Sequence, residues 1–208
     1  MTLHVSGSLK VCYNPIHHNT GISIMTEQTE QDLGLIAYQQ GDYETAFAEW
    51  HKLALNDNPQ ACHNIAMLYE MGQGVEQDLE LAKHWCEQAI KLGLVEAQHH
   101  LGYLLLESDP IAALECWQKA AEAGLAQAQY DLGGQYAAGD IIPQDNDTAA
   151  DWYEEAAMQG HTEAQFHLGV LYANAEQYAN ARHWWLQAAE QGHELAQFNL
   201  QRMKEMGL

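Results

Sequence analysis

The chain has 208 residues, of which 47% are hydrophobic, and this length and composition suit one folded domain or one continuous repeat array. It carries 29 acidic residues against 8 basic ones, a formal net charge of −21. This balance argues against binding to nucleic acid or to anionic lipid, because proteins hold those phosphates mainly with lysine and arginine. The acidic side chains either keep the outer helix faces solvated or steer a basic partner toward the protein.

The first 24 residues differ from the rest of the chain. Residues 1–24 contain no Asp or Glu and show no helical period, so we expect a flexible extension, with Met25 as an alternative start. His17 and His18 lie here, but two adjacent histidines supply too few ligands for a metal ion. The sequence has neither a membrane-spanning apolar run nor the apolar core of a secretory signal. These features predict a cytoplasmic protein without membrane contact.

A pair of helices is clearest in residues 128–163. Leu132 and Tyr136 are four residues apart, which places them on one face of a first helix. The turn GDIIPQD follows, and in it Asp145 is expected to cap a second helix. Gly160 ends that helix, because glycine adopts the left-handed conformation at little cost. Neither helix can bury its apolar side alone, so the unit needs neighbouring copies.

Copies of this unit follow one another along the chain. Their first helices share a Leu-Gly pair, at Leu33-Gly34, Ile65-Ala66, Leu101-Gly102, Leu132-Gly133 and Leu168-Gly169. Their second helices share an aromatic column, at Trp50, Trp85, Cys116, Trp152 and Trp184. The next column reads His51, Cys86, Trp117, Tyr153 and Trp185, and small residues follow at Ala54, Ala89, Ala120, Ala156 and Ala188. Closing turns stand at Asn58, Gly93, Gly124, Gly160 and Gly192.

This period predicts an all-α fold, an α/α superhelical solenoid of about five helix-turn-helix repeats over residues 25–208. The predicted repeats are 29–60, 61–96, 97–127, 128–163 and 164–195, followed by a capping helix over 196–208. The aromatic column is expected to fill the core. Trp152→Ala is therefore predicted to lower the free energy of unfolding by about 3–5 kcal/mol.

At these residues the chain resembles a known family. The pattern Ala-x-x-x-Leu-Gly-x-x-Tyr, the G-x-G-V-x-x-D loop and the pattern Ala-x-x-Trp-Tyr-x-x-Ala-Ala-x-x-Gly are similar to the Sel-one-like repeat, a branch of the tetratricopeptide superfamily. The resemblance covers the chain from Thr29 to the C-terminus. It implies a superhelix that holds other proteins and is usually not an enzyme.

Cysteine-rich secreted relatives in this family join the two helices of each repeat by a disulfide. Here Cys62 matches the first of those positions, but Ile90 stands at the partner position. The other repeats carry no cysteine at the first position but Glu30, Gln98, Gln129, Gln165 and Gln197. The absent disulfide ladder fits a reducing compartment.

The resemblance implies that the first helices line a concave groove. In the Leu-Gly register we expect nine side chains in that groove: His63, Met67, Glu70, His99, Tyr103, Tyr130, Phe166, Val170 and Phe198. A surface this rich in apolar and aromatic groups indicates a binding site, here for a protein or peptide segment with apolar or basic residues. The alternative is tight curvature, in which the same side chains pack on the next repeat.

Motifs for chemistry are missing. The 12 histidines include no H-E-x-x-H pattern and no evident tetrahedral ligand set, and no G-x-S-x-G elbow occurs. We therefore predict no metal, no cofactor and no catalysis, and a scaffold function. Two alternatives stay open: a β-lactam-binding or -hydrolysing enzyme like the cysteine-rich relatives, and a secreted or envelope protein that engages a host factor.

Overall fold

The computed structural model describes residues 32–208, and within this range it contains eleven α-helices and no strand. The helices pair in chain order: α1 (Leu33–Gln39) with α2 (Tyr43–Ala54), α3 (Pro59–Met71) with α4 (Leu79–Lys91), α5 (Val95–Leu105) with α6 (Pro110–Glu122), α7 (Ala126–Ala138) with α8 (Asn146–Met158), and α9 (Thr162–Asn174) with α10 (Tyr178–Glu190). The last helix, α11 (Glu194–Met206), follows α10.

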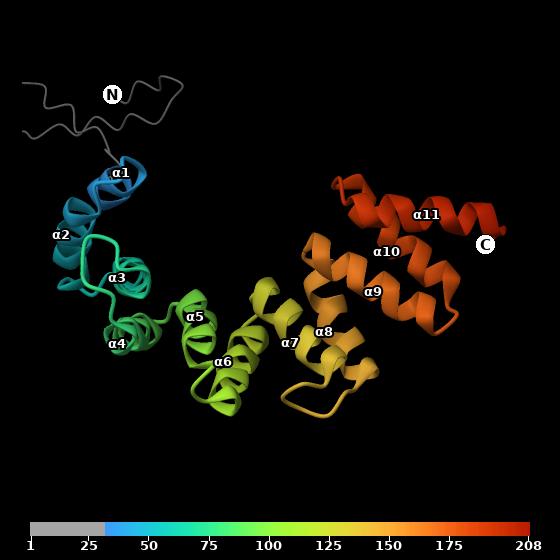
Figure 1. Ribbon diagram of the computed structural model, residues 1–208, viewed down its shortest axis with the longest axis horizontal. Coiled ribbons are helices and arrows are strands. Elements are labelled where there is room, and N and C mark those ends of the chain that lie inside the picture. Colours follow the sequence, from blue (N-terminus) through green and yellow to red (C-terminus); the bar gives the residue numbers. More distant parts are fainter. Residues whose placement is uncertain (1–31) are drawn as a thin grey trace, which may run out of the picture.

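The helix pairs follow one another along an arc, with α5 on its inner side and α6 on its outer side (Figure 1). Each helix contacts mainly its neighbours in the sequence, as in α3 with α4 and α4 with α5. The predicted all-α superhelical solenoid is confirmed. The predicted extension over residues 1–24, with His17 and His18, lies outside the described residues.

Aspartates begin four of the second helices. The Oδ1 atom of Asp42 accepts a hydrogen bond from the Thr45 amide at 3.1 Å, and Oδ1 of Asp145 accepts one from the Thr148 amide at 3.1 Å. Asp78 and Asp109 cap α4 and α6 in the same way. These bonds satisfy amides that have no partner inside the helix. The turn that the sequence predicted at Asp145 therefore does begin a second helix, and the same capping recurs in three other repeats.

Within each repeat, a small residue of the first helix lies against one side chain of the second. The pairs are Gly34 with Trp50, Gly102 with Trp117, Gly133 with Tyr153 and Gly169 with Trp185. A Cβ atom built on Gly102 would lie 2.4 Å from Nε1 of Trp117, so only glycine leaves room for this ring. The second repeat has Ala66 and the smaller Cys86 at these positions, and both are fully buried.

These contacts correct the predicted aromatic column. The buried rings belong to the next column, at Trp117, Tyr153 and Trp185, whereas Trp85, Trp152 and Trp184 are only partly buried. A helix turns 100° per residue, so a register error of one position moves a side chain from the core to its edge. The expected cost of Trp152→Ala falls below the 3–5 kcal/mol predicted above, because the ring is not in the core.

The predicted alignment of the first repeat with the other repeats is also wrong by one position. Trp50 is buried with Ala46 one turn before it, as Tyr153 is with Ala149, so Trp50 belongs to the buried column. The closing turn is then Asp57, which has a φ of 59°, and not Asn58. Asn58 instead caps α3, where its side chain accepts a hydrogen bond from the Ala61 amide at 2.9 Å. Leu53 consequently replaces Ala54 at the small-residue position.

The later first helices begin two residues before the predicted repeat borders. The predicted starts, at residues 61, 97, 128, 164 and 196, are buried alanines, whereas the helices begin at residues 59, 95, 126, 162 and 194. The hydrophobic pattern marks the first core contact of a helix and not its first turn. The observed helix starts, which the capping residues set, therefore lie on the N-terminal side of the predicted repeat borders.

Glutamines stand where the cysteine-rich relatives have their first cysteine. Nε2 of Gln129 donates to the carbonyl of Ala121 at 3.1 Å, and Nε2 of Gln165 donates to the carbonyl of Ala157 at 3.1 Å. Both glutamines are 4% exposed. Each bond joins a first helix to the end of the preceding second helix, where carbonyl groups lack helical partners. Hydrogen bonds thus connect adjacent repeats at these positions.

Gly133→Ala is expected to lower the free energy of unfolding by about 1–3 kcal/mol, because the new methyl group meets the Tyr153 ring at 2.8 Å. Gly134→Ala is the matched control: its Cβ would meet only the Tyr153 hydroxyl, at 3.6 Å, and alanine favours the helix by about 1 kcal/mol. Urea denaturation followed by circular dichroism measures both. Equal destabilisation by the two variants would show that the ring contact does not limit this position.

Candidate functional site

We name the nine predicted groove side chains, His63, Met67, Glu70, His99, Tyr103, Tyr130, Phe166, Val170 and Phe198, the first-helix face. They lie on α3, α5, α7, α9 and α11, and none belongs to the fully buried core. Tyr103 is 44% exposed and Phe198 is 57% exposed, while the other seven side chains are half-buried. The face is therefore a continuous but unevenly accessible surface.

A polar column beside this face links neighbouring repeats, and the sequence analysis did not recognise it. Its members directly precede the leucine or isoleucine of the Leu-Gly register: Asp32, Asn64, His100, Asp131, His167 and Asn199. His100 and Asp131 each contact the first-helix face of the preceding repeat. The signal was visible, since a polar residue stands before that leucine or isoleucine in every copy.

His63 and His100 form the first of these links. Nε2 of His63 lies 3.1 Å from Nδ1 of His100, and Nε2 of His100 lies 2.9 Å from a carboxylate oxygen of Glu70. If His100 donates to Glu70, its Nδ1 accepts from His63, and Nδ1 of His63 then carries no proton. That Nδ1 atom is buried and has no hydrogen-bond partner among the described residues. Burial, and then the nearby His100, lower the pKa of His63 to about 4.

Asp131 is the centre of the second link. One of its carboxylate oxygens lies 2.7 Å from Nε2 of His99 and accepts a 2.6 Å hydrogen bond from the Tyr103 hydroxyl. Gln127 donates to the same carboxylate. Burial raises the pKa of Tyr103, and Asp131 raises it further, so the phenol stays protonated and remains a donor. The ring of Tyr103 is thus held in place from the next repeat while part of it stays exposed.

Two helix-capping histidines also stack on the first-helix face. Nδ1 of His161 accepts a hydrogen bond from the Ala164 amide, and its ring stacks on Tyr130 with centroids 4.7 Å apart. Nδ1 of His193 accepts from the Ala196 amide, and its ring stacks on Phe166 at 4.4 Å. Tyr130 and Phe166 therefore pack on the next repeat, as the tight-curvature alternative expected. Tyr103 and Phe198 stay more accessible.

The cysteines of the described residues are not arranged for chemistry. Cys62, Cys86 and Cys116 are buried free thiols. Burial raises the pKa of Cys86 to about 12, so this thiol is protonated near neutral pH and is a poor nucleophile. Ile90, at the position of the relatives' second cysteine, packs beside Cys62.

Across residues 32–208 no three His, Cys, Asp or Glu side chains are grouped in a way that could hold a metal ion. No helix in this part of the chain combines the length and the apolar character that crossing a membrane requires.

His63 should make the folded state sensitive to acid. Its pKa is about 4 when folded and about 6.5 when unfolded, so below pH 6.5 the unfolded chain takes up a proton that the folded chain does not. Stability is thus complete above pH 6.5 and falls toward pH 4, by at most about 3 kcal/mol from this group. His63→Gln should flatten urea-denaturation midpoints across this window, whereas His183→Gln, at an exposed site, should not. An unchanged pH dependence in His63→Gln would contradict this assignment.

Comparison with known proteins shows which repeat family these helix pairs match. The family model of the Sel1 repeat matches residues 59–94, 95–125, 126–161 and 162–193. Each matched segment starts at the first residue of a first helix, α3, α5, α7 and α9 respectively. The four segments are contiguous and make up more than half of the chain.

Two solved structures and one curated sequence are similar over most or half of this chain. The crystal structure of c5321, a protective antigen of uropathogenic Escherichia coli with an SLR fold, is 31% identical with a TM-score of 0.77, covering 84% of this chain and 40% of that one. A Sel1 repeat protein from Oxalobacter formigenes is 32% identical with a TM-score of 0.73, covering 83% of this chain and 54% of that one. Uncharacterized protein NMB1327 of Neisseria meningitidis serogroup B is 30% identical over 108 residues, 52% of this chain and 23% of that protein. The chain thus spans between about a quarter and about half of these relatives' lengths.

Proposed function

Because this chain belongs to the Sel1 repeat family, we propose that it is a non-catalytic scaffold whose first-helix face holds an extended segment of a partner protein. Sel1 repeat proteins generally mediate protein–protein interactions, and their solenoid is typically a non-enzymatic scaffold.

The observation that carries the proposal is the exposure of large apolar side chains on one side of the first helices. Leu35 on α1 is 45% exposed, Tyr103 on α5 is 44% exposed and Phe198 on α11 is 57% exposed. Burying such groups against a partner is favourable, since about 25 cal/mol is gained for each Å² of apolar surface removed from water. Aromatic side chains are also the residues that most often dominate binding energy at interfaces.

The inter-repeat contacts support this choice. Tyr103 is held by Asp131 through a 2.6 Å hydrogen bond, so its ring loses little conformational freedom when a partner binds. Glu163 on α9 lies 3.3 Å from Nε2 of His193, whereas Glu96 on α5 is exposed and has no ion-pair partner in residues 32–208, so Glu96 favours basic residues in the partner segment. The partner proposed is therefore an extended segment that combines apolar and basic side chains.

We also propose that the scaffold acts in the cytoplasm and uses no cofactor. The free, buried state of Cys62, Cys86 and Cys116 supports a reducing compartment, where unpaired thiols persist. The β-lactam alternative gains no support from these thiols, since burial raises their pKa values.

A second candidate is a protein that engages a host factor from outside the cytoplasm. It is supported by the similarity to c5321, which is described as a protective antigen of uropathogenic Escherichia coli. Fractionation of cells that express the tagged full chain separates the candidates. Recovery in the cytoplasmic fraction supports the first, and recovery in the envelope or medium supports the second.

The groove proposal is tested with peptides selected from a random library on the immobilised chain. Tyr103→Ala combined with Phe198→Ala is expected to weaken binding of the selected peptides by about tenfold or more, because both rings lose contact area with the segment. The dissociation constants are measured by fluorescence anisotropy with the purified variants.

The matched control is Leu81→Ala combined with Leu186→Ala. These leucines are 40% and 42% exposed on the second helices α4 and α10, so a similar amount of exposed apolar surface is removed elsewhere. Binding should stay within about twofold of the unmodified chain. Equal weakening by the two double variants would overturn the assignment to the first-helix face.

A further inference from the structure

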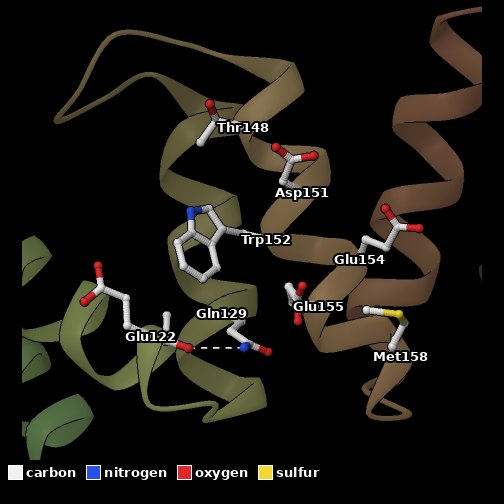
Figure 2. Close-up of a pocket in the computed structure, with 9 residues that line it drawn as sticks. Glu122, Gln129, Thr148, Asp151, Trp152, Glu154, Glu155 and Met158 are labelled. Atoms are coloured by element: carbon white, nitrogen blue, oxygen red, sulfur yellow. Dashed lines mark hydrogen bonds between the residues drawn. The ribbon is translucent and has the colours of Figure 1, made fainter.

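A second surface of the molecule lies between α6, α7 and α8, apart from the first-helix face. It is a pocket of about 630 Å³, within the size range of small-ligand sites. Its lining includes Glu122, Gln129, Asp151, Trp152, Glu155 and Met158. In Figure 2 the Trp152 indole lies between Glu122 on one side and Asp151 and Glu155 on the other. The pocket therefore combines an aromatic ring with carboxylates.

The carboxylates of this pocket are not neutralised by the protein. No Lys, Arg or His is among the residues that line it. In residues 32–208, Asp151, Glu154 and Glu155 form no ion pair. Burial raises the pKa of nearby Tyr172, and the charges of Glu154 and Asp151 raise it further, which reflects the negative potential here. Acidic residues are common on this chain, so charge alone does not make a site.

Trp152 and its repeat context distinguish this pocket from the rest of the acidic surface. Trp85 and Trp184 occupy the same position in other repeats, where His84 and His183 precede the tryptophan and Gln88 and Gln187 follow three residues later. Around Trp152 these two places hold Asp151 and Glu155. In those two repeats the solenoid folds with neutral or weakly basic groups at these positions, so packing does not require the two acids there.

The floor of the pocket is rigid. Gln129 is 4% exposed and donates to the Ala121 carbonyl at 3.1 Å (Figure 2). It also accepts a hydrogen bond from Gln159 at 2.7 Å. Trp152 is partly buried and packs against the cluster that contains Trp117 and Leu132. One part of the indole is thus fixed in the protein while another part borders the pocket. A preorganised site of this kind loses little entropy on binding.

We propose that this pocket takes the side chain of an arginine from a partner protein. A guanidinium group is planar and stacks on an indole face, where the cation–π attraction contributes about 0.5–2 kcal/mol. Its N–H groups donate to carboxylates in pairs, which Asp151 and Glu155 can accept. This contact is independent of the first-helix face, and it would add a basic anchor on the side of the second helices.

The probe for this site is the peptide acetyl-Gly-Ser-Arg-Ser-Gly-amide, compared with the same peptide carrying citrulline, the neutral isostere of arginine. The indole N–H resonance of Trp152 is followed in NMR spectra of the ¹⁵N-labelled full chain, and it is assigned by its loss in Trp152→Phe. At physiological ionic strength, which screens long-range attraction, the arginine peptide should shift this resonance saturably. The citrulline peptide should not.

Asp151→Asn combined with Glu155→Gln is expected to weaken binding of the arginine peptide by about tenfold or more, because charge-assisted hydrogen bonds are lost. The matched control, Glu76→Gln with Glu107→Gln, removes the same charge from exposed positions elsewhere and should bind within about twofold. Circular dichroism checks that both variants fold. Equal shifts with citrulline, or equal weakening in the control, would overturn the proposal. Neither outcome bears on the first-helix face, whose selected peptides are measured separately.

Discussion

The fold depends on the close contact between a small residue of each first helix and a buried side chain of the second, which in four of the five repeats is a glycine against an aromatic ring. This contact lets the two helices approach closely, and it also orients the surface on the other side. Nε1 of Trp117 donates to the carbonyl of His99 at 3.2 Å, and Nε1 of Trp185 donates to the carbonyl of Phe166 at 3.1 Å. His99 and Phe166 belong to the first-helix face, so the core ring is bonded to the backbone that carries the proposed binding residues.

Contacts between repeats are made by a different chemistry. Where the cysteine-rich relatives have a disulfide within a repeat, this chain has buried glutamines that bond to the preceding repeat, as Gln129 does to Ala121. Histidines supply further links, since His161 and His193 each cap a helix and stack on a ring of the previous repeat. Hydrogen bonds and ring stacking are individually modest, so the array is held by many small contributions that repeat along its length.

The two proposed binding surfaces differ in a way that follows from helix position. The first helices present histidines and aromatic rings, and their carboxylates are largely occupied, as Asp131 is by His99 and Tyr103. The second helices carry acids such as Asp151 and Glu155 that have no basic partner in residues 32–208. A partner with an apolar segment and a separate basic residue would therefore meet complementary chemistry on both sides of the solenoid.

The sequence by itself determined the helical repeat, its number of copies, and the aspartate caps such as Asp145, because these depend on local spacing and on turn chemistry. The helical period also fixed which residues share a face of one helix, as His99 and Tyr103 do, whereas the family resemblance implied that Tyr103 and Phe198 line a common groove. Only the tertiary structure decided that Tyr153 and not Trp152 fills the core, because a difference of one residue in register decides which neighbouring helix a ring meets. The pairing of His99 with Asp131 likewise joins residues 32 positions apart. Such a contact depends on how two repeats are rotated against each other, which no local pattern specifies.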